Sequence, residues 1–363
     1  MIIAKIEAFP LSIPFGTGAA LPGPPRPPGV SSLLVRVRTD EGHEGWGEAF
    51  GFEATRVTRR ALEDLVAPLC AGQDATRIGP LTRMVQEKLH VFGRGGSVIH
   101  ALSAVDTALW DIAGKAAGVP LHRLLGGGGN PDLACYASLD PYGNPAAVRA
   151  GVRQALDAGF TQVKLHERQL GSVRAAREEA GPATGLMLDV NCPWTLAQAR
   201  VKAAELRDLH LKWLEEPLWP PEDYDGLASL RAGCGIPLAA GENVSALLDF
   251  GRLMSAGAVD FVQPSPAKMG GVTELCKVFQ AAAARNVTVM PHTFYHGPGL
   301  LAAVHVTAAL GTAGAMIEWR HSALEAWPYG PALMPEHGRI QVPQGPGLGA
   351  DPDPDVLNRY LTA

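Results

Sequence analysis

Val163-Lys164-Leu165-His166 is a short apolar run that ends in polar side chains, and six further runs along the chain end in the same way. Successive endings are separated by 23 residues (242 to 265) to 27 residues (215 to 242). A strand, a helix and two short loops together take roughly 25 residues. The period is therefore that of one βα unit with a polar group where each strand ends. The six further runs are Leu188-Asp189-Val190-Asn191, Leu214-Glu215-Glu216, Gly241-Glu242, Gln263-Pro264-Ser265, Met290-Pro291-His292 and Ile317-Glu318.

This repeat predicts a parallel barrel, in which the carboxyl ends of all strands meet on one face. We expect a (β/α)7β TIM-type barrel, an α/β fold, over residues 126–326, with alanine-rich helices between the strands. A leucine-rich solenoid has a similar period, but it repeats leucines at fixed offsets and these segments do not. The expected strands are 133–139, 161–166, 185–191, 211–216, 237–242, 260–265, 287–292 and 315–319.

Residues 1–125 have a different pattern, in which strands come first and helices follow, as in an α+β domain. We expect strands at 1–14 and 31–50, the second with a hairpin turn at Asp40-Glu41-Gly42. The segment 10–29 is dense in proline and glycine and predicts an irregular surface loop. Residues 327–363 are again rich in these residues, so we expect a tail that returns to this capping domain. The expected helices are 55–69, 81–90 and 97–117.

Composition excludes several classes of partner. The net charge of -5 argues against nucleic acid or an anionic membrane surface, and no apolar run is long enough to span a bilayer. The amino terminus alternates like a strand and lacks the apolar stretch of a signal peptide. Five widely spaced cysteines without a metal-type pattern predict free thiols in a reducing compartment. We therefore expect a cytoplasmic protein, and we expect it to form a homo-oligomer.

Three carboxylates end neighbouring strands of the predicted barrel, namely Asp189, Glu215 and Glu242. Hard oxygen ligands without cysteine suit Mg²⁺ rather than Zn²⁺, and Mn²⁺ is expected to substitute. Asn191 lies two positions after Asp189 and should face the same side, where we expect it to bind substrate. Glu216 should point the other way and stay outside the metal shell.

Groups suited to proton transfer lie around the same predicted mouth. Lys164 and His166 are two positions apart on one strand, so both should project to one side and each should disfavour the charged form of the other. Either one is then a candidate base. His292 ends the seventh strand and should approach a substrate from the opposite side. Glu318, at the eighth strand, is expected to hydrogen-bond a substrate oxygen.

Several motifs resemble those of the enolase superfamily, and more closely those of its mandelate racemase and muconate lactonizing enzyme subgroup. The resemblance covers nearly the whole chain. It implies an α+β capping domain on a (β/α)7β barrel, Mg²⁺ on the three carboxylates, and abstraction of the proton α to a carboxylate through an enediolate. The motifs are the helix 101–115 with Pro120-Leu121 and Leu124-Leu125-Gly126-Gly127, then Leu214-Glu215-Glu216-Pro217, Lys268-Met269-Gly270-Gly271-Val272-Thr273 and Pro346-Gly347-Leu348-Gly349.

Two positions depart from that family's usual pattern. The second position of the family's Lys-x-Lys on strand two is His166 here, and the aspartate that usually pairs with the strand-seven histidine is replaced by Ser265. A serine hydroxyl can orient the ring of His292 but adds no charge, and we also expect Ser265 to contribute to substrate binding. We therefore expect His292 to be mostly neutral at pH 7, a weak general base that can still act as an acid.

These residues support three hypotheses. The first is a Mg²⁺-dependent lyase that dehydrates a sugar acid or a related hydroxy acid, with His292 protonating the departing hydroxide. The second is a racemase, epimerase or cycloisomerase on the same scaffold. The third is a non-catalytic relative that keeps the metal site, and Ser265 is the feature that favours it. The substrate itself is expected to be a small carboxylate. Arg26, the charged residue of the loop 15–30, is a candidate for binding a second anionic group.

Overall fold

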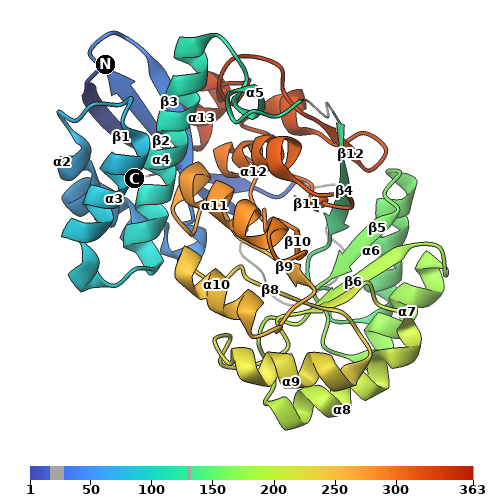
Figure 1. Ribbon diagram of the computed structural model, residues 1–363. Helices are drawn as coiled ribbons and strands as arrows, with labels where there is room; N and C mark the ends of the chain where they lie inside the picture. Colours follow the sequence, from blue (N-terminus) through green and yellow to red (C-terminus); the bar gives the residue numbers. More distant parts are fainter. Residues whose placement is uncertain (17–27, 129–131, 363) are drawn as a thin grey trace.

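The structure is a computed structural model that describes residues 1–16, 28–128 and 132–362. Figure 1 shows a sheet and several helices, blue to cyan, beside a barrel of strands with helices outside it, green to orange. Within the described residues, no helix has the length and apolar content needed to cross a bilayer.

The capping unit is an antiparallel sheet packed against helices. Its strands pair in the order β1-β2-β3, and the hairpin turn predicted at residues 40–42 joins β2 and β3, with Gly42 at φ 85°. The long helix α4 packs on β3 because β3 carries glycines there: a Cβ at Gly47 would lie 1.8 Å from the backbone oxygen of Ala104. The elements are β1 (Ile3–Pro14), β2 (Gly29–Thr39), β3 (Glu44–Ala49), η1 (Phe52–Ala54), α1 (Thr55–Ala61), the π-helix η2 (Leu62–Val66), α2 (Ala67–Cys70), α3 (Ile78–Lys88), η3 (His90–Phe92), α4 (Gly96–Ala117) and α5 (Leu121–Leu124).

The prediction that residues 10–29 form an irregular loop is wrong at both ends of that segment. β1 continues to Pro14 and β2 begins at Gly29, paired with each other. Proline is tolerated in β1 because β1 is an edge strand of this sheet, where a missing backbone N–H costs no ladder bond. Residues 17–27, and Arg26 with them, lie outside the described part of the chain.

The barrel confirms the predicted alternation of strands and helices. Eight strands run parallel through the described residues, in the order β10-β9-β8-β7-β6-β5-β4-β11, and seven helices follow the first seven strands. The strands are β4 (Asp132–Ser138), β5 (Gln162–Leu165), β6 (Gly185–Asp189), β7 (Trp213–Glu215), β8 (Leu238–Ala240), β9 (Phe261–Val262), β10 (Thr288–Val289) and β11 (Ile317–Arg320). The helices are α6 (Pro145–Asp157), α7 (Leu170–Ala180), α8 (Leu196–Leu206) with η4 (Arg207–Leu209), α9 (Tyr224–Cys234), α10 (Leu247–Ser255), α11 (Gly271–Ala283) and α12 (Pro298–Leu310).

The barrel interior is filled by large side chains, so it is a packed core rather than a pore. No ladder of hydrogen bonds joins β10 to β11 among the described residues, and there the backbone N–H of Met316 donates to the sulfur of Met290 at 3.4 Å. The buried side chains form a floor beneath the face where the strands end. This floor consists of Tyr136, Met187, Trp213, Ala239, Met290 and Met316.

The tail contains η5 (Gly330–Leu333), β12 (Arg339–Gln341) and α13 (Pro354–Tyr360). β12 adds an antiparallel partner to β4, and α13 packs against β1 of the capping unit. The backbone N–H of Thr362 donates to Pro10 O at 2.8 Å. The tail therefore returns to the capping unit as predicted, while the segment limits 125/126 and 326/327 stay predictions.

Candidate functional site

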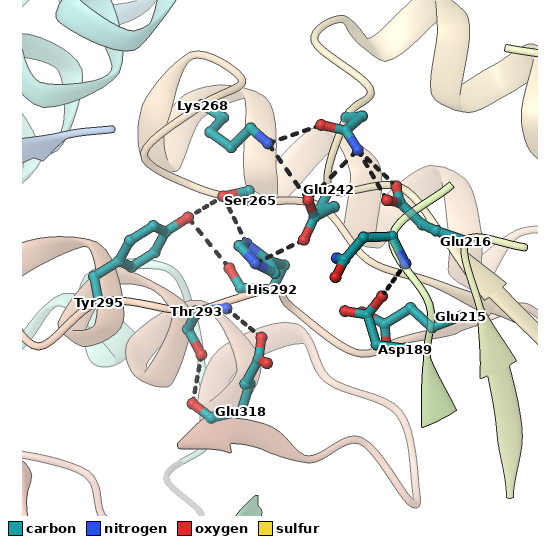
Figure 2. A network of polar contacts seen from close by, with 12 residues as sticks. Asp189, Glu215, Glu216, Glu242, Ser265, Lys268, His292, Thr293, Tyr295 and Glu318 are labelled. Atoms are coloured by element: carbon teal, nitrogen blue, oxygen red, sulfur yellow. Dashed lines mark hydrogen bonds and ion pairs between the residues drawn. The ribbon is translucent and has the colours of Figure 1, made fainter. Parts of the chain in front are cut away.

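Three carboxylates meet where neighbouring barrel strands end. Asp189 and Glu215 are the last residues of β6 and β7, and Glu242 follows β8 by two positions. One oxygen from each lies within 4.8 Å of the others. Figure 2 shows the three side chains from close by. Gly241 turns the chain toward this point at φ 140°, and a Cβ there would lie 2.8 Å from the backbone nitrogen of Gln263. An all-oxygen donor set of this kind fits Mg²⁺.

Lys164 is buried at the centre of the acidic cluster, with no exposed side-chain surface. Its Nζ lies 2.8 Å from Glu215 Oε1, 2.8 Å from Glu318 Oε1 and 3.4 Å from Asp189 Oδ2. Burial disfavours the ammonium, but Glu215 and Glu318 outweigh it and raise the pKa of Lys164 well above its ordinary value. The expectation that a neighbouring histidine frees this lysine as a base is therefore wrong, because the carboxylates dominate its surroundings.

His166 lies on the same side as Lys164, as predicted, and reaches the mouth of the barrel. Its Nδ1 is 2.6 Å from the backbone oxygen of Leu139, and its Nε2 is 3.2 Å from Asp189 Oδ2. Burial lowers the pKa of His166, whereas the contact with Asp189 raises it, and the result is above the ordinary value. The expected lowering by Lys164 is present, but it is smaller than the effect of Asp189.

His292 follows β10 and faces the carboxylates from the other side. Its Nε2 lies 2.8 Å from Glu242 Oε2, and its Nδ1 lies 3.2 Å from Ser265 Oγ. Burial lowers the pKa of His292, but Glu242 and then Glu318 raise it above its ordinary value. The expectation that His292 lacks a charged partner is therefore wrong, because Glu242 provides the charge that position 265 does not. That His292 is mostly neutral at pH 7 stays a prediction.

Glu318 lies below the mouth, where both of its oxygens are engaged by the protein. Oε1 contacts Lys164, and Oε2 accepts a hydrogen bond from the backbone N–H of Thr293 at 3.0 Å. The side chain is fully buried. The structure thus places Glu318 against Lys164, and its predicted contact with a substrate oxygen stays a prediction.

A cavity of about 590 Å³ opens above the carboxylates, between the barrel and the capping unit. This volume is within the range of small-molecule sites. His166 and His292 lie on its wall, and so does Asn191, whose backbone N–H donates to Asp189 Oδ1 at 2.9 Å. The rest of the wall is formed by Phe50, Phe52, Pro141, Gly143, Glu167, Arg168, Gln169, Glu242 and Phe294.

Sequence reasoning missed two aromatic residues that follow His292. The ring of Phe294 lies between the two histidines, with its centroid 5.6 Å from that of His166 and 6.4 Å from that of His292. Tyr295 is buried, and its hydroxyl contacts Ser265 and the backbone oxygen of His292. In the sequence, their position just after the end of a barrel strand was the signal that could have identified them as site residues.

Lys268 links the capping unit to the site and was noted from the sequence only as part of a motif. Its Nζ donates to Asn243 Oδ1 at 3.1 Å and lies 4.8 Å from the ring centroid of Phe50. Asn243 in turn donates to both oxygens of Glu216, which lies behind Glu242 and outside the group of three carboxylates, as expected. All five cysteines are free thiols.

Two family models match the chain. Residues 147–356 match the enolase C-terminal domain-like family, and residues 29–126 match the N-terminal domain of mandelate racemase and muconate lactonizing enzyme. Together they cover most of the barrel, the tail and the capping unit.

Curated proteins and solved structures agree with these matches. The chain is 30% identical to D-galactarolactone cycloisomerase of Agrobacterium fabrum, over 90% of each chain. It is 34% identical to D-galactonate dehydratase of Verminephrobacter eiseniae, over 76% of this chain and 74% of the relative. The crystal structure of 3,6-anhydro-D-galactonate cycloisomerase from Zobellia galactanivorans superposes with a TM-score of 0.89, at 30% identity and full coverage of both chains. The acidic cluster and the two histidines therefore lie on a scaffold that these relatives share.

Proposed function

Because the chain belongs to the mandelate racemase and muconate lactonizing enzyme group of the enolase superfamily, we propose that it removes the proton α to the carboxylate of a sugar acid and then eliminates water. The observation that supports this proposal is the arrangement of side chains at the mouth of the barrel. Three carboxylates lie between His166 and His292, and both histidines line one cavity.

We assign the metal site to Asp189, Glu215 and Glu242. Members of this superfamily generally bind Mg²⁺, and the donor set here fits it. The cluster also carries more negative charge than Lys164 can balance, so a divalent cation would relieve repulsion between the carboxylates. When bound, Mg²⁺ would supply positive charge next to the substrate carboxylate, where negative charge develops as the α-proton leaves.

We assign the base to His166. Both contacts of the His166 ring are with oxygens that only accept, Leu139 O at 2.6 Å from Nδ1 and Asp189 Oδ2 at 3.2 Å from Nε2. We assign the proton of the neutral ring to Nδ1, where the contact is shorter, and the lone pair to Nε2. That atom faces the site, and the ring lines the cavity. Lys164 is the alternative base, but it is fully buried and held by three carboxylates. Its ammonium is better suited to balancing charge below the substrate.

We assign the acid to His292, on the opposite wall. In the proposed step, Nε2 of His166 takes the α-proton, and the pair of electrons left behind forms the enediolate. Those electrons then form a carbon–carbon double bond as the bond to the β-hydroxyl breaks. The hydroxide leaves with the proton from Nε2 of His292 as water. Asn191, on the cavity wall, is assigned to hold substrate oxygens.

Cycloisomerisation is the second candidate, because two of the relatives described above are named cycloisomerases. It shares the abstraction of the α-proton and differs in the oxygen that leaves, which is part of a ring. Racemisation requires His292 to act as a base, and the contact of its Nδ1 with Ser265 instead of a carboxylate disfavours that role. The homo-oligomeric state and the cytoplasmic location stay predictions.

The proposed function is tested with a panel of aldonic and aldaric acids and their lactones, each incubated with the protein and Mg²⁺. We expect one or a few acids to lose water and give a 2-keto-3-deoxy product, and a chelator to stop the reaction. A lactone converted to an isomer of equal mass would select the cycloisomerase instead. If every compound is recovered unchanged, the hypothesis of a non-catalytic relative replaces both.

A further inference from the structure

Tyr295, Ser265 and His292 form a buried chain of polar contacts behind the face of His292 that lines the cavity. The hydroxyl of Tyr295 contacts Ser265 Oγ, and Ser265 Oγ lies 3.2 Å from Nδ1 of His292. Figure 2 marks both contacts with dashed lines. The tyrosine ring packs edge-on against the imidazole, with 6.0 Å between their centroids. Each hydroxyl is enclosed by protein, since Ser265 and Tyr295 are both buried.

The phenol of Tyr295 keeps its proton. Burial raises the pKa of Tyr295 well above its ordinary value, and the negative charges of Glu48 and Glu242 raise it further. The pair of hydroxyls therefore brings two O–H donors to the Nδ1 side of His292. An aspartate at position 265 would bring only acceptors.

This difference decides which nitrogen of a neutral imidazole carries the proton. An acceptor next to Nδ1 requires Nδ1–H and leaves a lone pair on Nε2, as in a general base. A hydroxyl can donate or accept, so it fits either tautomer; when it donates to Nδ1, the proton of the ring is on Nε2. At the other end of the ring, Glu242 Oε2 lies 2.8 Å from Nε2 and as a carboxylate can only accept. Glu242 therefore favours the tautomer in which Ser265 donates to Nδ1.

We propose that Tyr295 is a positioning residue that, through Ser265, holds the neutral ring of His292 in the tautomer with its proton on Nε2. Tyr295 donates to Ser265, and Ser265 donates to Nδ1. The neutral ring then carries its proton on Nε2, the atom that faces Glu242.

This inference rests on the proposed function, because it explains how His292 serves elimination rather than racemisation. A resting ring that carries Nε2–H has a proton to give to a leaving hydroxide. It has no lone pair at Nε2 with which to take an α-proton from its side of the substrate. The proposed function assigns His166 the opposite tautomer, on the shorter contact of its Nδ1 with Leu139 O. The two histidines then differ in chemistry, although both line the cavity.

The experiment measures which tautomer His292 adopts. It uses ¹⁵N NMR spectra of protein with ¹⁵N-labelled histidines, recorded at a pH at which His292 is neutral. Spectra are taken with saturating Mg²⁺ and with a chelator, and the resonances are assigned by their loss in His292→Gln. Tyr295→Phe removes one hydroxyl and keeps the ring, and Ser265→Asp replaces the donor by an acceptor. Tyr329→Phe is the matched control, since Tyr329 is a buried tyrosine whose hydroxyl has no hydrogen-bond partner among the described residues.

We expect Nδ1 of His292 to be unprotonated in the unmodified protein and in Tyr329→Phe, and protonated in Ser265→Asp. Tyr295→Phe should shift the ratio of the two tautomers about fivefold toward Nδ1–H, the effect of roughly one hydrogen bond. A protonated Nδ1 in the neutral ring of the unmodified protein would overturn the proposal. An unchanged ratio in Tyr295→Phe would remove Tyr295 from it. The spectra do not depend on turnover, so a chain that converts no sugar acid would refute the proposed function and leave this inference standing.

Discussion

The Nδ1 atom of His166 lies 2.6 Å from the backbone oxygen of Leu139, the residue that follows β4. This contact is shorter than the 3.2 Å between Nε2 and Asp189 Oδ2, and both oxygens only accept. We therefore assign the proton of a neutral His166 to Nδ1 and the basic lone pair to Nε2, as the proposed function requires. The first prediction follows from this contact.

Replacing His166 by alanine should stop the exchange of the α-proton with solvent. A positioned general base contributes about 10²–10⁴-fold, so the exchange rate should fall by that factor. Mg²⁺ binding, measured by calorimetry, should persist because the three carboxylates are untouched. His90→Gln, on the exposed surface of the capping unit, is the control. Exchange at the unmodified rate in His166→Ala would move the base to Lys164 or His292.

Mg²⁺ should stabilise the folded protein, because it binds the native carboxylate cluster and not the unfolded chain. At 100 times its Kd the gain in the free energy of unfolding is about 2.7 kcal/mol, seen as a rise in Tm. Glu215→Gln should abolish the rise, and Mn²⁺ should produce a similar one in the unmodified protein. Glu216→Gln is the matched control, since Glu216 is the adjacent buried acid outside the group of three. Equal Mg²⁺ responses in both variants would contradict the assigned ligands.

Lys164→Ala should destabilise the protein more than the loss of an exposed lysine does. Lys164 is fully buried between Glu215 and Glu318, and its loss leaves uncompensated buried carboxylates. Breaking a buried ion pair in this way costs about 3–5 kcal/mol. Denaturant unfolding in chelator measures the loss. Lys202→Ala, which breaks an exposed pair with Glu205, should cost less than about 1 kcal/mol. Similar losses in the two variants would show that Lys164 is not held as described.

Glu48 should make stability fall as pH rises. Burial raises the pKa of Glu48 to about 7, against the effect of the hydrogen bond it accepts from Gly299 N–H. The folded state therefore holds a proton on Glu48 more tightly than the unfolded state. Its contribution is fully present below about pH 4.5 and is lost as pH rises through about 7. Glu48→Gln should flatten this part of the pH profile of the free energy of unfolding, whereas identical slopes would exclude the effect.

The spacing of polar strand endings predicted most of the barrel. It gave seven of the eight barrel strands to within a few residues, because every βα unit has a similar length and each of these seven endings is marked by a polar residue. The same spacing predicted that Asp189, Glu215 and Glu242 converge, since adjacent parallel strands end side by side.

The charge balance of the site could not be predicted in this way. Lys164 and Glu318 are 154 positions apart (318 minus 164) and meet only because the ring of strands brings β11 close to β5 through β4. The contact of Glu242 with His292 depends on side-chain reach across the mouth. Tyr295 was missed because a tyrosine after a strand end is a common core residue, and only the fold places its hydroxyl on Ser265.

The proposed elimination is tested most directly by a reaction in D₂O with Mg²⁺ and an acid sugar that the panel identifies as a substrate, with product and recovered substrate examined by NMR. We predict a dehydrated product from a substrate that has lost its α-proton, and recovered substrate with deuterium only in the original configuration at the α-carbon. This pattern follows if His166 is the base and His292 keeps its Nε2 proton. Recovered substrate with an inverted, deuterated α-carbon would contradict the account and establish two bases, as in an epimerase.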